Sequence, residues 1–174
     1  TRLTEQKGID LLATKLEYFL HKYKFRFALL GSGERRYTDF FHYIAWKYPK
    51  LAIIDIGYNN NLSHKLFAAS DFFLMPSRFE PCGLTQMYSM KYGTIPIARI
   101  AGGLADTIME YNYENSQGSG FLFWQYNADD FSYAIERALQ IYNNQPHWNN
   151  IRRNAMANNF SSEKSALDYI EVFN

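Results

Sequence analysis

The sequence predicts an α/β fold in which a doubly wound, Rossmann-like parallel sheet is flanked by helices. Short apolar runs of strand length recur along the chain, and segments with helical spacing separate them. This alternation is typical of parallel strands joined by crossover helices. Polar and glycine residues follow several of the predicted strands, and ligands of such sheets bind beyond the carboxyl ends of the strands. We therefore expect a single site at that edge of the sheet.

Composition limits the classes of protein to which the chain can belong. Its 174 residues, 47% of them hydrophobic, are enough for one domain with a core, and a net charge of +1 argues against a general nucleic-acid binder. One cysteine, Cys82, excludes an internal disulfide and fits a reducing compartment. With no long apolar run, no signal-peptide pattern and no cluster of metal-ligand spacing, we expect a cytoplasmic protein without membrane contact, metal or other cofactor.

The expected elements follow in order along the chain. Apolar runs predict strands at 25–30, 51–56, 71–75, 94–98 and 120–123. Helical spacing predicts helices at about 9–23, 35–48, 62–70, 84–92, 129–142, 148–158 and 162–173, with Asn127 or Asp129 capping the fifth. Segments 99–106 and 110–120 are expected to be loops, and 143–150 a turn. The Gly-Ser-Gly-Glu run at 31–34 is interpreted as a tight strand-to-helix turn, in preference to a phosphate loop, because it is too short for a dinucleotide fingerprint.

The segment from Pro76 to Tyr88 is the centre of the predicted site. Pro76 ends a buried strand because it has no N–H for the ladder, so the carboxylate of Glu80 is fixed at the carboxyl end of that strand. The N–H groups of Gly83, Leu84 and Thr85 open the next helix, where they lack helical partners and favour an anion. A carboxylate for hydroxyls beside N–H groups for phosphate predicts a nucleotide-sugar site.

Three segments together resemble the bacterial glycogen synthase and plant starch synthase family. They are RLTEQKG at 2–8, PSRFEPCGLTQMYSMKYG at 76–93 and GGLADT at 102–107. Gly57-Tyr58 and Ser63-His64 also match. The run FEPCGLTQ is far more specific than a short glycine pattern, and the resemblance covers nearly the whole chain but only the C-terminal half of such an enzyme.

The resemblance implies a GT-B glycosyltransferase with two domains. Residues 1–174 would form the nucleotide-sugar (donor) binding domain, and the N-terminal acceptor and catalytic domain would lie outside this chain, which opens in mid-motif. Members of the family transfer glucose from ADP-glucose to the non-reducing end of an α-1,4-glucan, with retention and without a required metal. We expect this domain alone to bind ADP or ADP-glucose with little or no turnover, because the acceptor would bind mainly to the N-terminal domain.

The resemblance also implies roles for individual residues. The catalytic set would be Glu80, Lys7 and Arg2: the two cations bind the diphosphate and stabilise charge on the leaving ADP, and Glu80 holds glucose hydroxyls. Substrate binding would involve Tyr58 stacked on adenine together with Cys82, Gly83, Leu84, Thr85, Gly102 and Gly103. Many related glycosyltransferases carry a second glutamate where this chain has Tyr88. Glycogen and starch synthases share that change, which leaves the ribose contact unassigned.

Several alternatives stay open at this stage. Arg2 and Lys7 are equally explained as solvated charges, Tyr58 as an aromatic packed on the core, and Arg99 as either a phosphate ligand or a surface ion. Cys82, taken alone, is a small packed residue without an adjacent base. The fold is also compatible with a UDP-sugar transferase, or with a nucleotide- or glucan-binding module that has no catalysis.

Overall fold

The computed structural model describes residues 1–173. Its strands are β1 (Arg2–Leu3), β2 (Phe27–Gly33), β3 (Ala52–Ile56), β4 (Phe72–Met75), β5 (Ile95–Arg99) and β6 (Phe121–Phe123). Its helices are the 3-10 helix η1 (Glu5–Lys7) and the α-helices α1 (Ile9–Tyr23), α2 (Arg35–Lys47), α3 (Asn60–Ala69), α4 (Thr85–Lys91), α5 (Gly103–Thr107), α6 (Ala128–Tyr142), α7 (Gln145–Ala157) and α8 (Ser162–Phe173).

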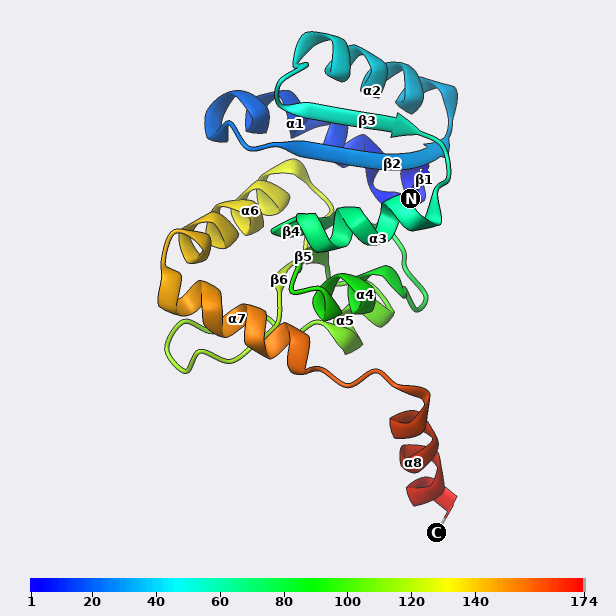
Figure 1. The fold of residues 1–174 in the computed structure, drawn as a ribbon, viewed down its shortest axis with the longest axis vertical. Coiled ribbons are helices and arrows are strands. Elements are labelled where there is room, and N and C mark those ends of the chain that lie inside the picture. Colours follow the sequence, from blue (N-terminus) through cyan, green and yellow to red (C-terminus); the bar gives the residue numbers. More distant parts are fainter. Residues whose placement is uncertain (174) are drawn as a thin grey trace.

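The strands form two parallel sheets flanked by helices, which confirms the predicted fold class. The first sheet has the order β1-β2-β3 and the second β4-β5-β6. In Figure 1 the first sheet lies with α1 and α2, and the second with α3 to α7, while α8 stands away from the body. Strand β5 is buried along nearly its whole length, as expected for a central strand covered on both faces. In residues 1–173, no helix is both long and apolar enough to cross a membrane.

The predicted turn at 31–34 is wrong, because Gly31, Ser32 and Gly33 are the last residues of β2. There they pair with β1, in the register Arg2 with Ser32 and Leu3 with Gly33. A Cβ atom on Gly31 would lie 2.4 Å from the carbonyl oxygen of Thr1, and one on Gly33 would lie 2.3 Å from that of Leu3. Because Gly31 and Gly33 have no side chain, the backbone of residues 1–3 can pack closely against β2.

Two further loop predictions are also corrected. Segment 99–106 contains the start of the short helix α5, and the predicted turn 143–150 contains the start of α7 at Gln145. Proline is compatible with the first turn of a helix, where its missing N–H has no partner to lose, so Pro146 does not break α7. The predicted cap of α6 is confirmed: the side chain of Asn127 accepts hydrogen bonds from the N–H groups of Asp129 and Asp130.

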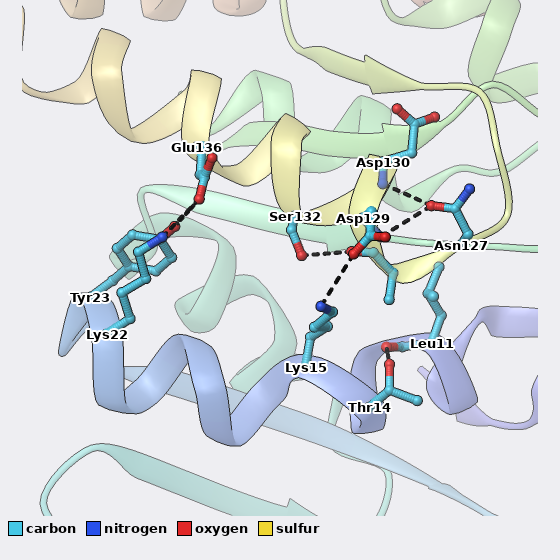
Figure 2. A network of polar contacts seen from close by, with 11 residues as sticks. Leu11, Thr14, Lys15, Lys22, Tyr23, Asn127, Asp129, Asp130, Ser132 and Glu136 are labelled. Carbon is cyan, nitrogen blue, oxygen red and sulfur yellow. Dashed lines mark hydrogen bonds and ion pairs between the residues drawn. The ribbon is translucent and has the colours of Figure 1, made fainter.

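Helices α1 and α6 join the two parts of the structure. Between them, the rings of Phe19 and Phe131 lie edge to face with centroids 5.9 Å apart, and both side chains are fully buried. Figure 2 shows the polar rim of this contact, where Glu136 receives hydrogen bonds from Lys22 and Tyr23 at 2.9 and 2.6 Å. The buried rings supply most of the stabilisation, since exposed ion pairs contribute little.

The second junction lies beside the predicted site and depends on Gly8. Gly8 has φ +71° and forms the end of η1, and a Cβ atom there would lie 1.9 Å from the carbonyl oxygen of Pro76. Next to it, the N–H of Arg78 donates to the carbonyl of Gln6 at 2.9 Å. The backbone after β4 is thus seated directly on the turn that precedes α1.

We expect Gly8→Ala to lower the free energy of unfolding by more than about 1 kcal/mol, because a side chain here meets both a left-handed backbone and the Pro76 carbonyl. Gly57→Ala is the matched control, since its Cβ would have Asp55 Oδ1 as nearest neighbour at 3.8 Å. Chemical denaturation of both variants measures the difference. Equal midpoints for Gly8→Ala and the natural chain would contradict the close packing.

Candidate functional site

The structure brings two predicted site residues, Lys7 and Glu80, into direct contact. The Lys7 ammonium forms an ion pair with Glu80 Oε2, although the two residues are far apart in the sequence. Glu80 is 6% exposed, and 20% of the Lys7 side chain is exposed. A buried carboxylate needs a charged or hydrogen-bonding partner, and Lys7 supplies it while keeping part of its own surface open to a ligand.

The same carboxylate oxygen has a second partner that sequence reasoning missed. The hydroxyl of Ser77, which is 2% exposed, lies 3.3 Å from Glu80 Oε2 and donates to it. Serine is common in loops after strands, so nothing in the sequence indicated that this hydroxyl would face the carboxylate three residues later.

Gly102 and Gly103 admit a close backbone contact, and that contact is with the segment around Glu80. A Cβ atom on Gly102 would lie 2.1 Å from the Glu80 carbonyl oxygen, and one on Gly103 would lie 2.2 Å from that of Cys82. The N–H of Gly103 donates to the Glu80 carbonyl at 3.1 Å. The two predicted substrate-binding loops therefore form one continuous surface.

Gln86, which the sequence did not single out, ties this surface together. Its side chain is fully buried, and Nε2 donates to the carbonyls of Cys82 and Gly83 at 3.2 and 2.8 Å and lies 3.1 Å from Thr107 Oγ1. Thr107 in turn donates to the carbonyl of Gly103 at 2.6 Å. A glutamine on the buried face of an expected helix was the available signal.

A cluster of charged and aromatic groups supports the loop after β4. Arg78 lies over the ring of Tyr126 at 4.5 Å and pairs with Glu5 at 2.9 Å. Burial, together with a hydrogen bond to Asp10, raises the pKa of Tyr126 to about 12. Arg99 donates to the carbonyl of Arg78 at 2.8 Å and to that of Trp124 at 3.1 Å. Arg99 therefore supports the loop after β4, and these two hydrogen bonds explain its position without a phosphate ligand.

The other predicted residues are exposed. Cys82, Leu84 and Thr85 lie on the surface at the start of α4, and Tyr58 is 89% exposed in the loop after β3, so it does not pack on the core. Arg2 is exposed in β1, and no side-chain hydrogen bond or ion pair of Arg2 or Tyr58 occurs within residues 1–173. The described part of the chain has no group of three His, Cys, Asp or Glu side chains that could hold a metal ion.

The fold and this loop arrangement define a glycosyltransferase domain. Residues 1–158 match the family model described as Glycosyl transferases group 1, and the chain belongs to that family. Among curated relatives, the glycogen synthase of Thermosipho melanesiensis is 45% identical over 175 residues, covering all of this chain and 36% of the relative. That of Clostridium botulinum (strain Alaska E43) is 46% identical over 99% of this chain and 36% of the relative.

A solved structure agrees with these relatives. The catalytic domain of starch synthase IV from Arabidopsis thaliana, bound to ADP and acarbose, superposes with a TM-score of 0.88 and 35% identity, over 99% of this chain and 36% of that one. The resemblance predicted from the three sequence segments is confirmed. The chain spans about a third of the length of these relatives.

We expect Gln86→Leu to destabilise the fold by about 1–3 kcal/mol, because the carbonyls of Cys82 and Gly83 lose a buried donor. Gln140→Leu, on the exposed face of α6, is the control and should change little. Urea denaturation compares the two. If both variants unfold at the same concentration as the natural chain, Gln86 does not hold the loops together.

Proposed function

We propose that this chain is the donor-binding domain of a retaining glucosyltransferase that transfers glucose from ADP-glucose to the non-reducing end of an α-1,4-glucan. The glycogen synthases that share about 45% of its residues support this activity. So does the starch synthase neighbour, whose structure holds ADP and acarbose. The glucan acceptor would lie mainly on a further domain of the whole protein, so that the isolated chain binds donor but turns over little.

The contact between Lys7 and Glu80 is the observation that carries the proposal. It places a cation and a carboxylate side by side at the carboxyl end of β4, where α/β sheets bind ligands. A departing ADP gains negative charge in the transition state, and a fixed cation beside it stabilises that charge. Lys7 would serve the diphosphate together with Arg2, and Glu80 would accept hydrogen bonds from the glucose hydroxyls.

The exposed residues around this pair complete the proposed donor site. The N–H groups of Gly83, Leu84 and Thr85 precede or begin α4 and would bind phosphate oxygens. Tyr58 presents an open ring on which adenine would stack. Because lysine, arginine and backbone N–H groups supply the positive charge, the reaction would need no metal. We place the protein in the cytoplasm.

We expect the chain to bind ADP more tightly than UDP, and Lys7→Ala to weaken ADP binding by about 10- to 100-fold through loss of a charge-assisted hydrogen bond. Titration calorimetry measures both. Lys15→Ala is the control, since Lys15 pairs with Asp129 at the contact between α1 and α6 and lies outside the proposed site.

The nucleotide series also separates the alternatives. Tighter binding of UDP than of ADP would indicate a UDP-sugar as the donor in place of ADP-glucose. No heat of binding with either nucleotide at millimolar concentration would contradict a donor site altogether. Equal ADP affinity in Lys7→Ala and the natural chain would contradict the role of Lys7.

A further inference from the structure

We infer that Ser77 is a positioning residue, which fixes the Glu80 carboxylate so that Oε2 holds Lys7 and Oε1 faces the donor sugar. The inference rests on the proposed function and goes beyond it in assigning separate tasks to the two carboxylate oxygens. It arises from the geometry of three side chains that the fold brings together from the turn before α1 and the loop after β4.

The two partners of Glu80 lie on the same oxygen. Oε2 receives the ammonium of Lys7 and the hydroxyl of Ser77, the latter at 3.3 Å. Glu80 and Ser77 are 6% and 2% exposed, so water cannot readily replace the serine hydroxyl. Two donors that approach one oxygen from different residues fix the rotation of the carboxylate about its last bond, which is otherwise a broad torsion.

The other oxygen, Oε1, is left for a ligand. Within residues 1–173, Oε1 has no hydrogen-bond partner. The side-chain atoms of these residues that are both buried and without a partner are Thr4 Oγ1, Tyr37 Oη, Gln86 Oε1 and Arg137 Nε, and Glu80 Oε1 is not among them. Oε1 therefore reaches the surface. A carboxylate oxygen held in a fixed direction is suited to accept hydrogen bonds from sugar hydroxyls.

The loop that carries Ser77 is anchored at the next residue by two hydrogen bonds. The N–H of Arg78 donates to the Gln6 carbonyl at 2.9 Å, and the Arg78 carbonyl accepts from Arg99 at 2.8 Å. Because the backbone is anchored immediately after Ser77, its hydroxyl acts on the carboxylate from a fixed point. A ligand-binding group is most effective when neighbouring residues restrain its orientation in this way.

The consequence differs for the two parts of the donor. Removing the hydroxyl leaves Lys7 on Glu80, so binding of the nucleotide should persist. The carboxylate gains rotational freedom, so the bonds from Oε1 to the sugar weaken. Loss of Ser77 should therefore affect ADP-glucose more than ADP.

The test compares Ser77→Ala with Ser89→Ala in the 174-residue chain. Ser89 is also fully buried, but its hydroxyl donates to the Gln86 carbonyl at 2.9 Å. Titration calorimetry gives the ratio of the ADP-glucose and ADP dissociation constants. We expect Ser77→Ala to raise this ratio about 3- to 10-fold, the loss of one ordinary hydrogen bond, and Ser89→Ala to leave it unchanged.

A double-mutant cycle with Glu80→Gln distinguishes positioning from general damage to the fold. If Ser77 acts through the Glu80 carboxylate, adding Ser77→Ala to Glu80→Gln should not raise the ratio further. An unchanged ratio in Ser77→Ala, an equal loss of ADP and ADP-glucose, or full additivity in the cycle would each overturn the inference while the natural chain still bound ADP-glucose. Failure of the natural chain to bind ADP would overturn the proposed function as well.

Discussion

The site depends on the close seating of the loop after β4 on the turn before α1. Gly8 allows this contact, because any side chain there would overlap the Pro76 carbonyl, and the hydrogen bond from Arg78 to Gln6 fixes its register. That seating is what brings Lys7 to Glu80. Without Lys7, the buried charge of Glu80 would have no ionic partner and would destabilise the fold. The same two residues therefore serve both the packing of the loop and the proposed donor chemistry.

Close backbone packing extends the same surface toward the loops that we predict to bind substrate. Gly102 and Gly103 lie against the carbonyls of Glu80 and Cys82, and Gln86 links the two segments through its bonds to Cys82 and to Thr107. Glycine pairs in such loops are often explained by approach of a ligand. Here the neighbouring protein backbone alone requires glycine at both positions. The groups that remain exposed, such as Thr85, are available to a donor.

The sequence was informative where residue chemistry is local. Apolar runs located β2 to β6 but not the two-residue β1, and the FEPCGLTQ run led to the family to which the chain belongs. It failed where the same residue serves several purposes. Gly31 and Gly33 were predicted to form a turn but lie in β2 beside β1, and segment 143–150 was predicted to be a turn but contains the first turn of α7. The partners of Ser77, Gln86 and Arg99 depend on loops meeting across the fold, which one sequence does not reveal.

We propose that Lys7 and Glu80 mark the place where a nucleotide sugar binds. The most direct measurement is a crystal structure of this chain with ADP-glucose. The diphosphate should lie within hydrogen-bonding distance of the Lys7 ammonium and of N–H groups at Gly83 to Thr85, with the glucose against Glu80. A nucleotide sugar bound elsewhere, with Lys7 and Glu80 free of contact to it, would show that this pair does not form the donor site.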